Sequence, residues 1–476
     1  MPTLIDFNAD WLFEGKATVT LPHTAVELPF SYFDEREYQR VFTYEKRFIA
    51  DPNWDGQEIS LQFDGAMANA EVSLNGTKLG GHADGYTPFD IRLTNGLKAG
   101  ENVITVKIDG SENPGIPPFG GVIDYLTYAG IYREVWLKVA PKFAIANVKI
   151  ETHDVMNVRP RVTAKVFIAN PEDLPLTGHI EGTIISGSQV IASTAATLNA
   201  DELTLKFDGL ENIALWEIDN PALYTLNLKL TSNHGVDETA TRFGFRSAEF
   251  TPEGFKLNGR SLKLLGLNRH QSFPYAGYAM GKTAQHRDAE ILKNELKLNM
   301  VRTSHYPQAT SFLERCDELG LLVFEEIPGW QHIGDKAWQA ASIDNVRAMI
   351  TRDWNHPSIV IWGVRINESQ DNHDFYVETN RLARELDATR PTGGVRFITD
   401  SELLEDVYTM NDFILGQEEL GGNRPRTPLR DQREVTGLDR VVPYMITEFG
   451  GHMYPTKSHD QEQRQAEQVT RHLEVL

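Results

Sequence analysis

The chain has little of what ties a protein to a membrane or to an oxidising compartment. Its 476 residues include one cysteine, Cys316, which excludes an intramolecular disulfide and any cysteine-rich zinc or iron–sulfur site. The first residues, MPTLIDFNADW, have no basic segment followed by an apolar stretch, so we expect no signal peptide. No uninterrupted apolar run is long enough to cross a bilayer. These absences predict a cytoplasmic protein without a membrane partner.

Positive charge is also scarce. Lys and Arg total 46 against 67 Asp and Glu, which gives a formal net charge of −21. Such a surface repels phosphate backbones and anionic lipid headgroups, so nucleic acid is not an expected partner. Hydrophobic residues make up 41% of the chain and aromatic residues 10%, which is enough for a sizeable core. The composition therefore indicates a soluble globular protein.

The first half of the chain has the pattern of β-structure. Short runs such as EISLQF (58–63), NVITVKI (102–108) and REVWLKV (133–139) alternate apolar and polar residues, as half-buried strands do. Pro141 marks a joint, and we expect one β unit over residues 1–141 and a second over 142–247. The second unit has enough strand-like runs for about seven strands in roughly 100 residues, which suits an immunoglobulin-like sandwich.

From residue 248 onward, apolar strand-like runs alternate with helix-like stretches. This alternation is typical of β/α units on a parallel sheet, and the spacing suits a (β/α)₈ barrel over residues 248–476, with its active site at the carboxyl ends of the strands. The expected strands are LKLLGLN (262–268), NMVRTSH (299–305), LLVFEEI (321–327), SIVIWGV (358–364), GGVRFIT (393–399), DVYTMND (406–412) and PYMITEF (443–449). Because the chain then ends in an apparent helix over 459–476, we expect the barrel to lack its eighth β/α unit. The overall expectation is a multidomain fold, β first and α/β after.

Polar and charged residues cluster where the expected barrel strands end. His270, Arg302 and His305 follow or end the first two strands, and Asn411 ends the sixth. Glu368, preceded by Asn367, follows the fourth strand, and Glu448 ends the seventh. Two carboxyl groups that flank a bond at one rim are the equipment of glycoside hydrolysis. Glu325 and Glu326, near the end of the third strand, are expected to play a structural role.

Several motifs resemble glycoside hydrolase family 2, which holds β-galactosidases, β-glucuronidases and β-mannosidases. In the barrel these are LGLNRHQSFP (265–274), RTSHYP (302–307), CDELGLLVFEEIP (316–328), RDWNHPSIVIWGVRINES (352–369) and ITEFGGH (446–452). In the first unit LPHT (21–24), GYTPFDIRLT (85–94) and YAGIYREVWL (128–137) are similar to the family's sugar-binding jelly roll. The resemblance covers nearly the whole chain in order. It implies a jelly roll, an immunoglobulin-like sandwich and a TIM barrel.

The resemblance also implies roles for individual residues. Glu368 would be the acid/base and Glu448 the nucleophile of a retaining reaction, with Asn367 on the sugar 2-hydroxyl. Arg302 would lie beneath the nucleophile and favour its ionised form; a purely structural ion pair is the alternative. His270 and His305 would contact the sugar, or else orient loops as core histidines. Trp362 would wall the pocket, and Asn411 would contribute to substrate binding.

The chain departs from the family pattern in three places. The eighth strand, which usually supplies a substrate-facing tryptophan, is not found. Phe413 aligns with the family's tyrosine beside the nucleophile, so that hydroxyl is missing or is replaced from elsewhere, with Tyr408 as the candidate. Trp330 stands where some family β-galactosidases have a metal-ligand carboxylate, so we expect no required magnesium and no cofactor.

The resulting hypothesis is a retaining exo-β-glycosidase that hydrolyses terminal β-D-galactosides. A β-glucuronidase or another family 2 glycosidase is the first alternative, although the Asn-x-Lys element that meets a glucuronide carboxylate is not evident after Glu448. A truncated, inactive fragment that acts as a carbohydrate-binding protein is the second. The expected partner is a small β-glycoside or oligosaccharide. A homo-oligomer is also expected, because the family's β domains often form subunit contacts.

Overall fold

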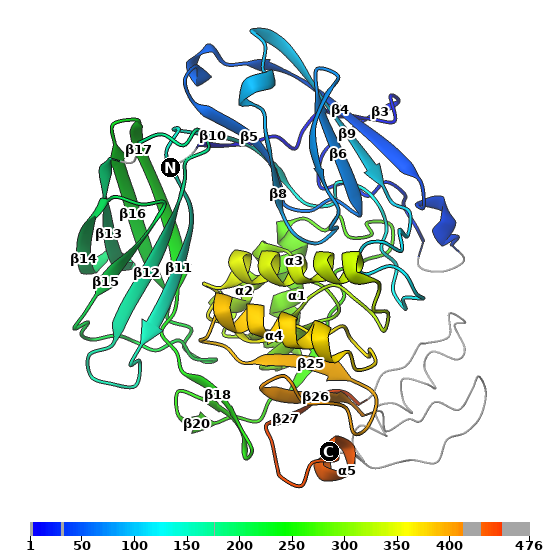
Figure 1. The fold of residues 1–476 in the computed structure, drawn as a ribbon, viewed down its shortest axis with the longest axis vertical. Helices are drawn as coiled ribbons and strands as arrows, with labels where there is room; N and C mark the ends of the chain where they lie inside the picture. Colours follow the sequence, from blue (N-terminus) through cyan, green and yellow to red (C-terminus); the bar gives the residue numbers. More distant parts are fainter. Residues whose placement is uncertain (1–2, 30–32, 176, 413–429, 450–476) are drawn as a thin grey trace.

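The computed structural model describes residues 3–29, 33–175, 177–412 and 430–449. Two β modules flank a barrel (Figure 1): the N-terminal module lies at the top in blue and the second at the left in green. Within the described ranges, no helix is both long and apolar enough to cross a membrane.

The N-terminal module is a sandwich of two sheets that enclose one hydrophobic core. Along β5, Ile59, Leu61 and Phe63 are fully buried while the residues between them are half-buried, which is the alternation that the sequence predicts. The four-stranded sheet has the order β1 (Thr3–Asp6), β10 (Val135–Ala140), β5 (Glu58–Phe63), β8 (Phe89–Arg92). The six-stranded sheet has the order β3 (Ala17–Val19), β2 (Trp11–Phe13), β4 (Val41–Ala50), β9 (Gly100–Asp109), β6 (Asn69–Leu74), β7 (Thr77–His82). Short helical turns, η1 (Glu35–Glu37), η2 (Pro52–Trp54) and η3 (Thr94–Gly96), lie in its loops.

The second module is a seven-stranded antiparallel sandwich, as the sequence predicts. Its sheets have the orders β11 (Ala144–His153), β12 (Arg161–Ala169), β15 (Glu202–Phe207) and β14 (Gln189–Leu198), β13 (Gly178–Ser186), β16 (Tyr224–Ser232), β17 (Gly235–Phe243). A small three-stranded antiparallel sheet follows, formed by β18 (Ala248–Thr251), β19 (Gly254–Leu257) and β20 (Arg260–Ser261). Phe255 and Leu257 of this small sheet pack against Leu322 and Phe324, so the sheet covers the amino-terminal end of the barrel.

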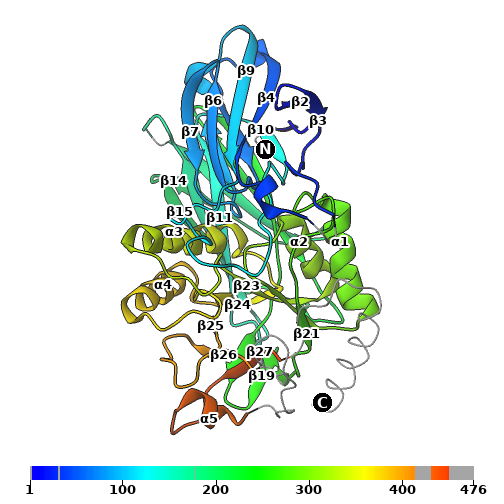
Figure 2. The ribbon, with the colours of Figure 1, turned by 90° about the vertical axis from the view of Figure 1, so that its right-hand side faces the viewer.

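The barrel contains all seven predicted strands, in sequence order and parallel throughout. They are β21 (Gly266–Asn268), β22 (Met300–Thr303), β23 (Leu322–Glu326), β24 (Ile359–Gly363), β25 (Thr392–Arg396), β26 (Val407–Asn411) and β27 (Tyr444–Glu448). The central strands are buried along their whole length, because the barrel interior covers one face and the helices the other. The last strand returns to the first, so the described sheet is a nearly closed barrel (Figure 2).

Helices cover the outside of the barrel. They are α1 (Lys282–Glu290), continued by the π-helical segment η4 (Ile291–Glu295), α2 (Thr310–Leu319), α3 (Lys336–Asp353), α4 (His373–Leu386) and the short α5 (Gln432–Thr436). Asp335 begins α3 by accepting hydrogen bonds from the amides of Ala337 and Trp338 at 3.0 Å. Gly320 ends α2 in the left-handed region, with φ of 69°, and a side chain there would meet the main chain of Ile218. The predicted helix over 459–476 lies outside the described residues, as does Phe413.

A long loop of the N-terminal module, residues 110–134, reaches the barrel. The Trp338 indole donates to the Phe119 carbonyl at 2.9 Å. Arg133 donates to Gln271 Oε1 at 3.0 Å and to the Pro307 carbonyl at 2.8 Å. These bonds hold the loop against segments that follow the carboxyl ends of β21, β22 and β23. The predicted fold class, a jelly roll, an immunoglobulin-like sandwich and a TIM barrel, is confirmed.

Candidate active site

Arg302 is the centre of the polar cluster at the carboxyl ends of the strands. It lies on β22, is buried, and donates from Nη1 to Glu448 Oε1 at 2.6 Å and from Nη2 to Asn367 Oδ1 at 2.8 Å. Glu326, the last residue of β23, binds the other side of the guanidinium through Nε and, at 3.0 Å, through Nη2. Burial opposes the charge of Arg302, but the carboxylates of Glu326 and Glu448 outweigh it and raise the Arg302 pKa. Arg302 is therefore a permanent cation shared by two carboxylates.

Asn367 is held so that one side of its amide is left for a ligand. Its Oδ1 accepts from Arg302, and its carbonyl accepts from the Gln331 amide at 2.7 Å. Its buried Nδ2 has no hydrogen-bond partner among the described residues. A buried donor without a partner is costly, so this N–H group is suited to an acceptor that arrives with the ligand.

Glu368 adopts a backbone conformation that is uncommon for a side chain with a Cβ. Its φ is 53°, in the left-handed region, and its amide donates to the Val395 carbonyl at 2.9 Å. Asn411 Nδ2 donates to Glu368 Oε1 at 2.9 Å, and Gln331 Nε2 donates to Oε2 at 3.2 Å. Asn411 itself accepts from the Thr447 hydroxyl at 2.8 Å. Asn411 therefore links Glu368 to β27, the strand that carries Glu448.

His270 and His305 lie together on the jelly-roll side of the cluster, with their ring centroids 5.5 Å apart. The pKa of each ring is lowered to about 3. Burial is the largest cause in both; it is followed by His305 and then Arg302 for His270, and by Arg302 for His305. His305 Nδ1 is 3.1 Å from Arg302 Nη2 and 3.4 Å from Glu326 Oε2. Because the ring is neutral, Nδ1 accepts from Arg302, and the contact with Glu326 is not an ion pair. The proton then lies on Nε2, which is suited to donate to a ligand oxygen.

The N-terminal module adds a residue that sequence reasoning missed. Asp124, in the loop 110–134, is exposed, and it lies near enough to Glu448 and Glu368 for their charges to act on its carboxyl group. Its surroundings raise its pKa to about 6, through desolvation first and then through Glu448 and Glu368. The only sequence signal is the length of this loop, which has no strand pattern between two clear strands, and long loops of that kind often carry function. Tyr125 beside it lies 5.2 Å from His270, centroid to centroid.

The two acidic residues that end β23 face in opposite directions. Glu326 points into the site and holds Arg302, whereas Glu325 is fully buried and accepts from Arg352 Nη2 at 3.2 Å. Burial and the neighbouring Asp353 raise the Glu325 pKa well above its ordinary value. Glu325 therefore belongs to the packing between β23 and α3 and does not take part in the site.

Two expectations about aromatic residues are corrected by the structure. Trp362 does not wall the site: it is fully buried among helix residues, and its indole donates to Asp387 Oδ2 at 3.0 Å, beyond the end of α4. Tyr408 does not replace the missing hydroxyl. It packs outside the barrel with Val435 of α5, and its ring centroid is 5.9 Å from that of Tyr444.

Within the described ranges, no group of three or more His, Cys, Asp or Glu side chains is arranged to hold a metal ion. The expectation that no magnesium is required stays a prediction.

Comparison with known proteins gives a family for every module. The model of the glycosyl hydrolases family 2 sugar binding domain matches residues 11–141, the family 2 model matches 143–246, and the family 2 TIM barrel domain model matches 249–472. The chain is 48% identical to a β-galactosidase of Thermoanaerobacterium thermosulfurigenes and covers 68% of it. It is 50% identical to a β-galactosidase of Rhizobium meliloti and covers 65% of that protein. Both alignments cover 100% of this chain, which thus spans about two thirds of these relatives.

A solved structure agrees on the fold. Bacteroides uniformis β-glucuronidase 2, covalently bound to cyclophellitol-6-carboxylate aziridine, has a TM-score of 0.85 over 100% of this chain and 63% of its own. At 23% identity this likeness speaks for the fold alone. The family models and the two relatives settle the family: this chain belongs to glycosyl hydrolases family 2.

Proposed function

We propose that the chain is a retaining β-galactosidase in which Glu448 is the nucleophile and Glu368 the acid/base. The observation that carries the proposal is the guanidinium of Arg302, which binds one oxygen of Glu448 and the amide of Asn367 at once. This arrangement leaves the second oxygen of Glu448 for attack and presents the amide N–H of Asn367 beside it. A nucleophile and a donor for an adjacent hydroxyl are what a glycosyl transfer needs.

In the first half of the reaction, the Glu448 carboxylate attacks the anomeric carbon and forms an ester bond as the glycosidic bond breaks. The departing oxygen takes the proton of Glu368, so the aglycone leaves as a neutral alcohol. Asn411 and Gln331 both donate to the Glu368 carboxyl, which holds it in place for this transfer. Asn367 Nδ2 donates to the sugar 2-hydroxyl, a contact that strengthens as charge develops on the ring.

In the second half, the ionised Glu368 takes a proton from water while that water attacks the anomeric carbon. The ester bond to Glu448 breaks, and its electron pair returns to the carboxylate beside Arg302. Two inversions at the same carbon retain the β-configuration. His305 Nε2 and the Asp124 carboxylate supply a donor and an acceptor for the remaining sugar hydroxyls.

The choice of galactose rests on the relatives. The two alignments that cover this whole chain, at 48% and 50% identity, are to proteins named β-galactosidase. The likeness to a β-glucuronidase structure, at 23% identity, reflects the fold. A soluble, strongly acidic protein also suits a neutral sugar better than an anionic one. The proposal includes a cytoplasmic location and assembly of the chain into a homo-oligomer.

The experiment is a panel of aryl β-galactoside, β-glucuronide, β-mannoside and β-glucoside with the purified 476-residue chain. The expected result is preferential hydrolysis of the galactoside, with β-galactose as the first product by proton NMR. Preference for the glucuronide would overturn the sugar assignment, and α-galactose as the first product would overturn the retaining mechanism. No turnover of any of the four would favour the carbohydrate-binding alternative.

A further inference from the structure

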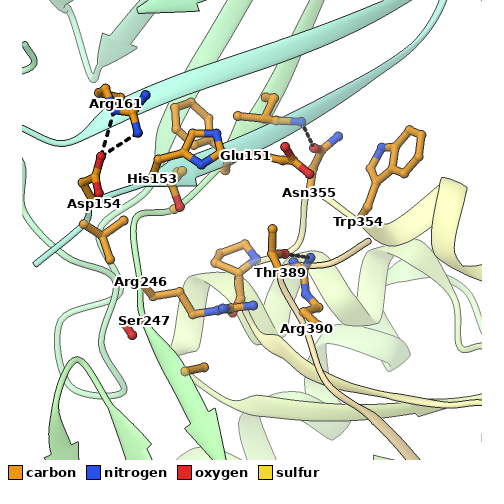
Figure 3. Close-up of a pocket in the computed structure, with 17 residues that line it drawn as sticks. Glu151, His153, Asp154, Arg161, Arg246, Ser247, Trp354, Asn355, Thr389 and Arg390 are labelled. Atoms are coloured by element: carbon orange, nitrogen blue, oxygen red, sulfur yellow. Dashed lines mark hydrogen bonds and ion pairs between the residues drawn. The ribbon is translucent and has the colours of Figure 1, made fainter. Parts of the chain in front are cut away.

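A cavity of about 390 Å³ lies between the immunoglobulin-like module and the barrel, away from the candidate active site. Figure 3 shows its walls, which come from the second β module, from residues 244–247 between β17 and β18 (the linker), and from the barrel. The labelled residues are Glu151, His153 and Asp154 at and after the end of β11, Arg161 of β12, Arg246 and Ser247 of the linker, and Trp354, Asn355, Thr389 and Arg390 of the barrel. The barrel residues come directly before β24 and β25. The cavity therefore opens at the amino-terminal ends of the strands, and the length of a five-residue strand, roughly 16 Å, separates it from the glutamates.

Among the residues that the structure describes, Arg246 is the charged residue of this cavity for which no direct ion pair is found. Its Nε donates to the Pro357 carbonyl at 2.6 Å and its Nη2 to the Ile359 carbonyl at 2.6 Å. Within the described ranges, no carboxylate forms an ion pair with it. Burial, and then the like charge of Arg390, lower its pKa to about 9. A guanidinium has five N–H groups, and these two bonds use two of them, so three N–H groups of Arg246 remain for a ligand.

The other charged residues of the cavity are already paired. Arg161 binds Asp154 Oδ2 through Nε at 2.8 Å, and Arg390 binds Asp387 Oδ2 at 2.6 Å. Glu151 binds Lys149 at 2.5 Å. The cavity consequently has one excess positive charge, that of Arg246, in a chain whose formal charge is −21.

We propose that this cavity is a binding site for a small oxyanion, a phosphate or carboxylate group, held by the guanidinium of Arg246 at the junction of the immunoglobulin-like module and the barrel. A planar guanidinium with spare N–H groups is the side chain best matched to such a group. His153 lines the same cavity, and its Nε2 is hydrogen-bonded to the Thr163 hydroxyl at 2.8 Å. A volume of about 390 Å³ exceeds that of a bare ion, so the oxyanion can be carried by a small molecule.

The site also has a mechanical consequence. The cavity walls come from both modules and the linker, and Asn355 already joins them by accepting from the Ile150 amide at 2.9 Å and donating to the Val148 carbonyl at 2.8 Å. A ligand that binds here contacts both bodies, so it stabilises their docking and raises the melting temperature of the folded chain.

The test is calorimetric titration of the full chain with inorganic phosphate and, separately, citrate, at matched ionic strength. We expect saturable binding of at least one of them, weakened at least tenfold in Arg246→Met. The matched control is Arg47→Met, an exposed arginine on β4 that pairs with Glu45 and Glu101; it should bind as the wild type does. Binding of inorganic phosphate would indicate a phosphate ligand, and binding of citrate would indicate a carboxylate ligand.

The proposal fails if the wild type binds neither anion, or if Arg246→Met folds and binds like the wild type. Should Arg246→Met not fold, crystals of the wild-type chain soaked in tungstate decide: an anomalous peak at the Arg246 guanidinium supports the site, and peaks only elsewhere overturn it. Because Arg246 is far from Glu448 and Glu368, β-galactosidase activity of the folded variant does not enter the test.

Discussion

Asn268 Nδ2 donates to the main-chain oxygen of Thr447 at 3.2 Å, a side-chain bond from the first strand of the barrel to the last. Thr447 precedes Glu448 and also donates to Asn411. Within the described residues, these two strands have no main-chain pairing with each other. The seam of the barrel is thus held by side chains, beside the strand that carries the proposed nucleophile.

Asn268→Ala removes this bond. We expect a loss of about 0.5–1 kcal/mol, the usual contribution of an exposed hydrogen bond, and a lower kcat because β27 loses one of its supports. The control is Asn233→Ala, which removes an exposed bond to Thr177 in the immunoglobulin-like module. Thermal unfolding and kcat for an aryl galactoside check both; an unchanged kcat in Asn268→Ala would mean that the seam does not position Glu448.

Glu448→Gln should abolish both chemical steps, because a neutral amide can neither attack the anomeric carbon nor leave as a carboxylate. We expect kcat to fall by at least about 10³-fold for every aryl galactoside, whatever its leaving group. Steady-state rates with dinitrophenyl and nitrophenyl galactosides measure this. Equal residual activity in Glu326→Gln and Glu448→Gln would instead implicate the whole Arg302 network.

Glu368→Ala should impair only the step that needs a proton. Substrates whose leaving group departs without protonation should keep most of their rate of glycosyl-enzyme formation, while poor leaving groups should lose about 10²- to 10⁴-fold. Azide should restore turnover and give the β-galactosyl azide. An α-azide, identified by NMR, would mean that the roles of Glu368 and Glu448 are exchanged.

Asp124 should be visible in the pH dependence of the reaction. With a pKa of about 6, its carboxyl is ionised and able to accept from sugar hydroxyls above that pH, so kcat/KM should fall as the pH drops through 6. Asp124→Asn should lower kcat/KM, mainly through KM, and remove this limb. Persistence of the inflection near pH 6 in the variant would assign it to another group.

The raised pKa of Asp124 also predicts how the stability of the chain depends on pH. Its pKa is raised on folding, so the folded chain binds more protons than the unfolded chain between about pH 4 and 6, and stability falls as the pH rises through that range. Asp124→Asn should therefore have a higher melting temperature than the wild type at pH 7. Near pH 4 the difference should be smaller, because Asp124 is then protonated in the folded chain and about half protonated in the unfolded chain.

His305 should make the chain sensitive to acid. Its folded pKa of about 3 lies below the ordinary 6.5, so the unfolded chain takes up the proton first. The associated stability is present above pH 6.5 and is lost as the pH falls toward 3. His305→Gln should flatten this loss between pH 6.5 and 4, whereas the exposed His179→Gln should not. If the melting temperatures of His305→Gln and the wild type fell in parallel between pH 6.5 and 4, the prediction would be contradicted.

The sequence predicted the seven barrel strands and the location of Glu368, Glu448, Arg302 and Asn411 at one rim. This succeeded because the carboxyl ends of parallel strands meet at the same edge, so residues at strand ends converge whatever their separation along the chain. The unusual φ of Glu368 agrees with this placement, since such conformations are concentrated at functional sites.

Side-chain direction was harder to predict. Trp362 and Tyr408 lie on strands that are buried on both faces, where apolar residues follow one another without alternation. Without that alternation, the sequence does not indicate which residues face the barrel interior and which face the helices. Trp362 faces Asp387 and Tyr408 faces α5, and only packing against the helices decided this.

By itself, then, the sequence determined the kinds of element, their order and the chemical groups at the strand ends, since these follow from local patterns. The tertiary structure alone decided that Asp124 lies near the glutamates and that Arg302 is shared by Glu326 and Glu448. It also decided that Arg246 lines a cavity in which no described carboxylate forms an ion pair with it. The reason is physical: docking and barrel closure bring distant segments together, and no local pattern records which charges then become neighbours.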